Sequence, residues 1–186
     1  ATAAELRSVV DIPITVAGGI RDAGDVAALV AKGFRAQIGR ALYEGRLDLA
    51  DAWTACIAFD ASGLVPTVVQ DQVSREVLML AWSSAESLRV ALGEGAGCYW
   101  SRSRQALWRK GATSGNTQML HAARFDCDRD CVRFEVTQTG PACHTGTPTC
   151  FGDARRNVLA DLFETLTARK RSTPTDGAKP VSYTHL

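Results

Sequence analysis

No stretch of the sequence is apolar over enough consecutive residues to cross a bilayer, because a spanning helix needs about 20 of them. The sequence also shows no secretory signal, which would combine a charged region with an apolar one. We therefore expect a cytoplasmic protein without a membrane partner.

Charge of one sign is not in excess either. The 186 residues include 21 Lys and Arg against 20 Asp and Glu, which gives a formal net charge of +1. Nucleic-acid-binding domains usually carry a basic surplus, so we expect no nucleic-acid partner. The hydrophobic fraction of 46% and the charged fraction of 22% are ordinary for a globular protein of one or two domains.

Cysteine is well represented, with six residues. In a reducing cytoplasm, thiols are kept for metals or for chemistry. Four of them, Cys127, Cys131, Cys143 and Cys150, lie in the stretch RFDCDRDCVRFEVTQTGPACHTGTPTC, which ends at Cys150. The chain is organised around this stretch.

Three carboxylates alternate at the start of the stretch, at Asp126, Asp128 and Asp130. In an extended strand they would share one face and Cys127 would take the other. Oxygen ligands suit Mg²⁺ or Ca²⁺, and thiolates suit Zn²⁺, so the pattern indicates two separate metal sites. The alternative is a solvated acidic turn, with Cys127 as a small buried hydrophobic residue.

The predicted zinc ligands are Cys127, Cys143 and Cys150. Structural zinc sites usually have four protein ligands, whereas a catalytic zinc keeps one position for water, so three cysteines favour catalysis. Turn residues before and between the last two cysteines support a metal loop: Pro141, Gly146 and Pro148. Cys131 is close enough in sequence to replace Cys127.

A basic segment precedes this stretch and offers donors for phosphate, with tryptophan rings for stacking a base. We interpret it as the binding site for a small phosphorylated nucleotide. The alternative is a solvated basic strand with two core tryptophans. The predicted substrate-binding residues are Trp100, Arg102, Arg104, Trp108, Arg109, Lys110, Thr113 and Ser114.

The first 55 residues have an α/β pattern. The run Ile12–Ala17 predicts a strand buried on both faces, Asp22 predicts a helix cap, and a second strand is expected near Arg35–Ile38. Loops at the C-terminal ends of such strands bind phosphate in (β/α)₈ barrels. The candidates are Gly18, Gly19, Gly39 and Arg40, although glycines also serve ordinary tight turns.

We place a boundary near Cys56–Ser62 and predict an α+β domain over residues 58–152, mostly antiparallel with a helix packed on the sheet. Strands are expected at Leu64–Gln70, Val77–Trp82 and Val132–Val136, and a helix after Ser83 or Ser84. Residues 153–186 predict one amphipathic helix that ends near Arg169–Lys170, followed by a linker-like segment.

Two flanking segments resemble other enzymes. IPITVAGGI and AQIGRALYEGRLDLADA resemble the last two βα units of the phosphoribosyl-formimino-AICAR-phosphate ketol-isomerase barrel. LADLFETLTARK resembles the opening helix of phosphoribosyl-ATP pyrophosphatase. These likenesses imply a piece of a multifunctional fusion protein, with an incomplete barrel of no isomerase activity and a truncated pyrophosphatase-like start.

The central domain resembles phosphoribosyl-AMP cyclohydrolase of histidine biosynthesis over about Gly63 to Gly152. The motifs occur in the family's order: GLVPTVVQD, EVLMLAW, YWSRSRQALWRKGATSGNTQ, FDCDRD and GPACHTGTPTCFG. The resemblance implies Mg²⁺ on the three aspartates and Zn²⁺ on Cys127, Cys143 and Cys150. It also implies a homodimer whose zinc site takes its first cysteine from one subunit and the later two from the other. Asn116 stands where many members have His.

The implied reaction is hydrolytic opening of the adenine N1–C6 bond of phosphoribosyl-AMP by zinc-activated water. Zinc nucleobase deaminases use related chemistry, but their H-x-E and P-C-x-x-C signature is absent. His144 is the candidate for proton transfer, or alternatively a residue that orients the loop. The competing interpretation is a non-catalytic, zinc-stabilised interaction domain.

Overall fold

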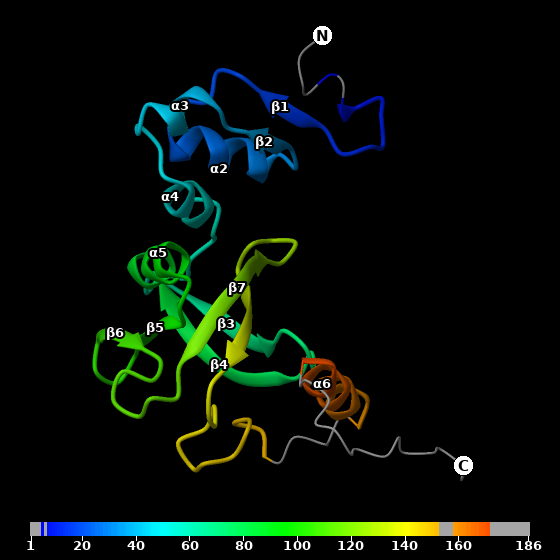
Figure 1. Cartoon of the computed structure of the whole chain (residues 1–186). Coiled ribbons are helices and arrows are strands. Elements are labelled where there is room, and N and C mark those ends of the chain that lie inside the picture. Colours follow the sequence, from blue (N-terminus) through cyan, green and yellow to red (C-terminus); the bar gives the residue numbers. More distant parts are fainter. Residues whose placement is uncertain (1–4, 6, 153–157, 172–186) are drawn as a thin grey trace. The chain divides into compact units, whose positions relative to one another are not determined.

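A computed structural model describes residues 5, 7–152 and 158–171 of the chain (Figure 1). The chain divides into two compact units, Ala1–Asp153 and Ala154–Leu186. The division falls between Asp153 and Ala154, and the predicted end of the central domain at Gly152 stays a prediction. The predicted boundary near residues 56–62 stays a prediction.

The first unit contains a six-stranded, curled sheet in the order β6-β5-β4-β3-β8-β7. Its strands are β3 (Leu64–Asp71), β4 (Val77–Ser84), β5 (Cys98–Ser101), β6 (Ala106–Arg109), β7 (Gln118–Phe125) and β8 (Val132–Gln138). The α+β class with a mostly antiparallel sheet is confirmed. Only β3 and β8 pair in parallel among these strands, and no local pattern in the sequence indicated that long-range pair.

Alternation along β8 shows why this sheet has one buried face. Val132, Phe134 and Val136 are fully buried, whereas Arg133 and Glu135 point to the other face. Side chains of successive strand residues take opposite faces, so burial with period two follows from the sequence pattern. Helix α5 (Ala85–Glu94) packs on the buried face through Leu88 and Ala91.

Helix α5 is bounded by local signals that the sequence contains. The Ser84 hydroxyl accepts a hydrogen bond from the Ser87 N–H, and the Ser87 hydroxyl accepts one from the Ser84 N–H, so the two serines form a capping box. Gly95 ends the helix in the left-handed conformation, with φ of 64°. The prediction of a helix capped at this point is confirmed.

The N-terminal segment pairs β1 (Thr15–Ala17) and β2 (Arg35–Gln37) in parallel, joined by α2 (Ala23–Ala31). Asp22 caps α2, as predicted. The prediction that the first strand is buried on both faces is wrong, because Thr15 and Ala17 are exposed. In the described residues this sheet has only two strands, too few to bury a strand on both faces.

Two short helices, α3 (Arg40–Tyr43) and α4 (Leu49–Thr54), continue the segment. A small core forms here around Val26, Ala41 and Leu47. The ring of Trp53, in α4, lies 5.7 Å from the ring of Phe125, the last residue of β7, measured between centroids. Helix α4 therefore lies beside the end of β7. The incomplete-barrel interpretation of these residues stays a prediction.

The second unit contains α6 (Val158–Arg171), so the predicted C-terminal helix is present. Its apolar residues Leu162, Phe163 and Leu166 are exposed. The predicted linker and the last six residues lie outside the described residues. Among the residues that the structure describes, no helix has the length and apolar character that crossing a membrane requires.

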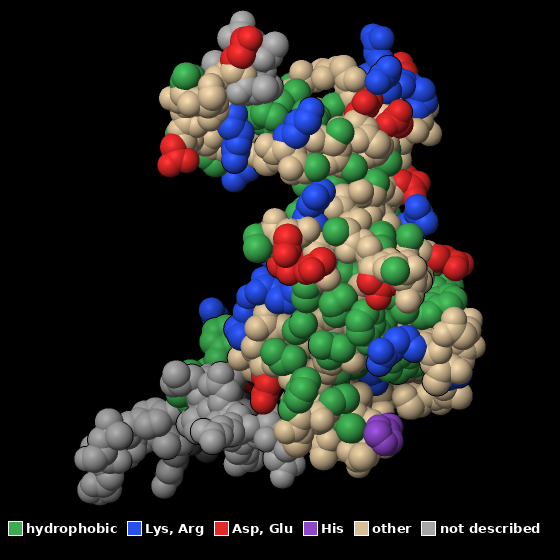
Figure 2. Space-filling model, turned by 180° about the vertical axis from the view of Figure 1, so that it is seen from behind, with side chains coloured by type: hydrophobic (Ala, Val, Ile, Leu, Met, Phe, Trp, Pro, Cys, Tyr) green, Lys and Arg blue, Asp and Glu red, His purple; other side chains and the backbone are tan. Residues whose placement is uncertain are grey.

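Apolar side chains are also visible over much of the face shown in Figure 2. In the first unit, exposed large apolar residues include Leu80, Met119 and Phe151. Leu80 alternates with the buried Met79 and Ala81 on β4 and therefore lies on the sheet face away from the core.

Candidate metal and nucleotide site

The three predicted magnesium ligands come together. The carboxylate oxygens of Asp126, Asp128 and Asp130 lie within 4.8 Å of one another, and all three residues are exposed. They form the loop between β7 and β8, and not a strand as the sequence suggested. Arg129 takes a left-handed conformation with φ of 70° inside this loop, which turns the chain so that the carboxylates converge.

The carboxylates of this cluster repel one another. Asp128 raises the pKa of the Asp130 carboxyl most strongly, with smaller contributions from burial and from Asp126. Like charges at this separation disfavour ionisation of both groups. A divalent cation would relieve the repulsion, and three carboxylates form the oxygen donor set that Mg²⁺ or Ca²⁺ prefers. The residues therefore fit the predicted cation.

Cys143 and Cys150 also meet, in the loop that follows β8. The Cys150 N–H donates to the Leu78 carbonyl oxygen across 2.8 Å, which fixes the loop to β4. Thr145 donates its hydroxyl to the Cys143 sulfur across 3.1 Å. This hydrogen bond is the main cause that lowers the pKa of the Cys143 thiol to about 6. Thiolates are the species that bind Zn²⁺, so this pair fits the predicted metal.

Cys127 does not join this pair within one chain. It is exposed in the aspartate loop, and its sulfur lies 3.9 Å from Asp128 Oδ1. The seven-residue β8 separates the aspartate loop from the Cys143 loop, a span of roughly 20 Å at about 3.3 Å per residue. Cys131, the alternative ligand, is half-buried, and burial raises the pKa of its thiol.

A cavity of about 400 Å³ adjoins the Cys143–Cys150 pair. Lys110 lines it, with its ammonium 3.5 Å from the Asn116 carbonyl oxygen. Burial lowers the pKa of Lys110, and the two cysteines oppose that shift. Predicted site residues in the cavity wall are Trp108, Lys110, Thr113, Ser114, Cys143, His144 and Cys150. His144 Nδ1 lies 3.8 Å from the Cys143 sulfur.

The other predicted substrate-binding residues lie outside this cavity. The Arg102 guanidinium stacks 4.7 Å above the Trp82 ring, beside Trp100 on the exposed side of β5. Arg104 donates to the Ser101 hydroxyl across 3.1 Å. Arg109 pairs with Glu94 of α5. Trp108 borders both the cavity and the surface around Arg102. The predicted substrate-binding residues therefore form two neighbouring surfaces, and Arg109 belongs to neither because it points to α5.

The predicted phosphate loops of the N-terminal segment lie at one edge. Gly18 and Gly19 follow β1, and Gly39 and Arg40 follow β2, whose last residue Gln37 pairs with Ala17. Gly18 and Gly19 have φ of 85° and 74°, in the left-handed region that glycine favours. Arg40 forms an exposed ion pair with Glu44 across 3.6 Å.

Two features of the site were not predicted from the sequence. Thr145 acts on Cys143 directly, and the repeated threonines of HTGTPTC were the available signal. The second feature is a group of arginines around Glu135, from β7, β8 and the β3–β4 turn. These residues are far apart in sequence, so no motif marked them.

Known proteins resemble the chain over this same region. The family model for phosphoribosyl-AMP cyclohydrolase matches residues 79–152. The phosphoribosyl-AMP cyclohydrolase of Paracoccus denitrificans is 53% identical over 103 residues, which are 55% of this chain and 85% of that protein. The enzyme of the same name from Micrococcus luteus is 55% identical over 101 residues, 54% of this chain and 80% of that protein.

Proposed function

The chain belongs to the phosphoribosyl-AMP cyclohydrolase family, and we propose from this that it hydrolyses the adenine ring of phosphoribosyl-AMP in histidine biosynthesis. The match to the family model is continuous over residues 79–152, which include the aspartate loop and both later cysteines. This continuity is the observation that carries the proposal.

Zinc-activated water is the proposed nucleophile. A zinc ion on these thiols would supply Lewis-acid activation of water, lowering its pKa toward about 7. Cys143 is suited to hold it because its thiol is already largely ionised at neutral pH. We propose that His144, beside Cys143, moves a proton toward ring N1 as the N1–C6 bond breaks.

The cavity residues would bind and orient the nucleotide. Lys110, Thr113 and Ser114 supply hydrogen-bond donors in the cavity wall, and Trp108 supplies an aromatic surface. Arg102 and Trp100 extend the binding surface beyond Trp108. Mg²⁺ on the aspartates would neutralise part of the phosphate charge of the substrate.

We further propose that the active form is a homodimer that completes each zinc site from two chains. Cys127 lies roughly 20 Å of strand away from Cys143 and Cys150 within one chain, so a second copy must supply it. Closed two-fold symmetry then generates two equivalent sites per dimer. The same arrangement brings the aspartate loop of one chain near the nucleotide cavity of the other.

Turnover by the full chain, followed by ultraviolet absorbance with Zn²⁺ and Mg²⁺ present, tests the activity. We expect turnover by the wild-type protein and none by Cys143→Ser. A folded, zinc-loaded dimer that fails to turn over the substrate would contradict the proposed function. A zinc site closed by His144 as a fourth ligand would then support a non-catalytic interaction domain instead.

Mixed dimers test the shared site. Co-refolded Cys127→Ser and Cys143→Ser chains regain one intact site in each heterodimer, so we expect about a quarter of the wild-type rate. The matched control mixes Cys143→Ser with Cys150→Ser. Both substitutions affect the pair of cysteines that a single chain contributes to a site, so no heterodimer contains an intact site. That mixture should stay inactive. Equal rates in the two mixtures would show that each site belongs to a single chain.

A further inference from the structure

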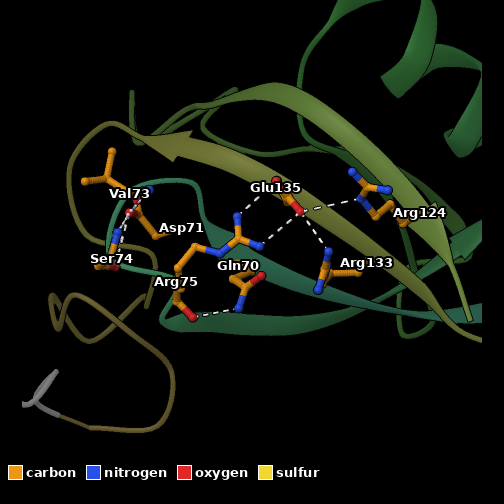
Figure 3. A network of polar contacts seen from close by, with 8 residues as sticks. All are labelled: Gln70, Asp71, Val73, Ser74, Arg75, Arg124, Arg133 and Glu135. Atoms are coloured by element: carbon orange, nitrogen blue, oxygen red, sulfur yellow. Dashed lines mark hydrogen bonds and ion pairs between the residues drawn. The ribbon is translucent and has the colours of Figure 1, made fainter.

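Three arginines converge on one carboxylate on the outer face of the sheet (Figure 3). Glu135 of β8 accepts from Arg75 at 3.1 and 3.3 Å and from Arg133 at 2.8 Å. Arg124 of β7 lies 3.8 Å from the same carboxylate. The Glu135 side chain is only 13% exposed, whereas the three arginines are 40–68% exposed. The cluster therefore presents its guanidinium groups to solvent.

The turn before β4 is built to place Arg75. Its backbone is left-handed, with φ of 64°, an uncommon conformation for a residue with a side chain. Gln70 holds it there by donating to the Arg75 carbonyl oxygen across 2.6 Å. Asp71 closes the same turn by accepting from the N–H groups of Val73 and Ser74. Figure 3 shows this turn directing the Arg75 side chain toward Glu135.

The positive charge of the cluster is not balanced. Three guanidinium groups surround a single carboxylate, so two positive charges remain unpaired among the contacts described. Arg133 also has a buried Nε without a hydrogen-bond partner in the described residues. Each guanidinium carries more N–H donors than Glu135 can accept. The arrangement thus retains both the charge and the donors that bind an oxyanion.

The position of the cluster suggests which anion it binds. Arg124 and Arg133 are partners across β7 and β8, and Arg124 lies two residues before Asp126. Arg124 is therefore about 7 Å along the strand from the first of the proposed cation ligands. A phosphate monoester is close to a dianion at neutral pH and matches the charge surplus of two.

We propose that Arg75, Arg124 and Arg133 form a binding site for a phosphate monoester, and that Glu135 holds their guanidinium groups in place. The assignment of the ligand rests on the proposed function, because phosphoribosyl-AMP has such a group at each end. One phosphate would bind here, and the Lys110 cavity of the other chain would take the rest of the nucleotide. The glutamate weakens binding electrostatically while it orders the arginines.

Substitutions that should change the phosphate affinity in opposite directions test this site. Inorganic phosphate is titrated at constant ionic strength by calorimetry, and KM for phosphoribosyl-AMP is measured in parallel. We expect Arg133→Met and Arg124→Met each to weaken phosphate binding and raise KM about tenfold, the loss of one charge-assisted hydrogen bond. We expect Glu135→Gln to tighten phosphate binding severalfold, because it removes a negative charge and keeps the side-chain shape.

The matched control is Arg89→Met, which removes an exposed arginine paired with Asp51 elsewhere in the same unit. This variant should change neither the phosphate affinity nor KM for phosphoribosyl-AMP. Arg124 is the least engaged member of the cluster and 68% exposed, so its variant remains informative if Arg133→Met fails to fold.

Each outcome is decisive. Unchanged phosphate affinity in all the cluster variants would contradict the proposed phosphate site. Glu135 would then be only the centre of an ion-pair network. Altered phosphate affinity with unchanged KM would overturn the assignment to the substrate. If the wild-type protein bound phosphate but turned over no substrate, the proposed function would fail while the anion site stood.

Discussion

At Cys143, a hydroxyl group rather than a cation stabilises the thiolate. Thr145 donates to the sulfur, and the pKa falls from about 9 to about 6. Because the shift is downward, the thiolate predominates above about pH 6 and the thiol below it. Metal uptake at neutral pH then releases less than one proton from this residue. The pKa of Cys150, the second predicted ligand of the pair, is raised instead, by desolvation of its thiol and then by the neighbouring Cys143.

Thr145→Val should therefore raise the pKa of Cys143 toward 9. Thiolate absorbance of the metal-free protein, taken as the difference from Cys143→Ser across pH, measures it. Thr137→Val is the control, because Thr137 contacts His121 and lies away from the cysteines. A transition that stays near pH 6 in Thr145→Val would show that the rest of the loop suffices to stabilise the thiolate.

Gln118 links buried polar groups in the core below the cavity. It is 2% exposed, accepts from the Tyr99 hydroxyl at 2.5 Å and donates to Gln138 Oε1 at 2.8 Å. Gln118→Leu leaves that hydroxyl buried without an acceptor, which costs about 1–3 kcal/mol. Urea unfolding should show this loss, and Gln72→Leu, at an exposed position, should show almost none. Almost no loss in Gln118→Leu would mean that water replaces the Gln118 acceptor.

At the scale of the element, helix α5 shows how a local signal fixes a boundary. Ser84→Ala removes a cap that accepts from the Ser87 N–H, and we expect the free energy of unfolding to fall by about 1 kcal/mol. Ser103→Ala, in the exposed turn after β5, is the control. A loss confined to Ser103→Ala would contradict the role of the cap.

The β3, β8 and β7 strands meet at Glu135, and this contact depends on pH. The Arg75 hydrogen bond lowers the pKa of Glu135, with smaller contributions from the Arg133 and Arg124 charges. Because the pKa of Glu135 is lower in the folded state than in the unfolded state, its ionised form stabilises the fold. This stability is fully present above the pKa of the unfolded state, near 4.3, and is lost as pH falls through the pKa of the folded state. Glu135→Gln should remove that part of the acid sensitivity, measured as the stability difference from the wild type between pH 7 and pH 3. A constant difference across this range would contradict it.

At the scale of the whole molecule, the zinc and the dimer should be coupled. Because Cys127 comes from a second chain in the proposed site, a zinc chelator should lower both thermal stability and the dimer fraction in sedimentation experiments. Cys127→Ser should do the same without a chelator. Cys131→Ser is the matched comparison, since Cys131 lies in the same loop region and is the alternative ligand; if Cys131 were the ligand, its variant and not Cys127→Ser would lower stability and the dimer fraction. A dimer that persists unchanged after zinc removal would mean that apolar surface alone joins the chains.

Sequence patterns determined much of this protein by themselves. Period-two alternation defined β8, Ser84 and Gly95 delimited α5, and Asp22 capped α2, because each signal acts within a few residues. The aspartates were predicted to cluster, although the sequence pattern suggested a strand and the loop conformation at Arg129 is what gathers them.

Only the tertiary structure decided what depends on distant contacts. The parallel pairing of β3 with β8 joins residues about 65 positions apart, and it alone brings Arg75 to Glu135. Cys127 and Cys143 lie beyond opposite ends of β8, because that extended strand separates their loops. Such relations follow from packing a curled sheet around one core, and the free energy that selects them is shared among many residues.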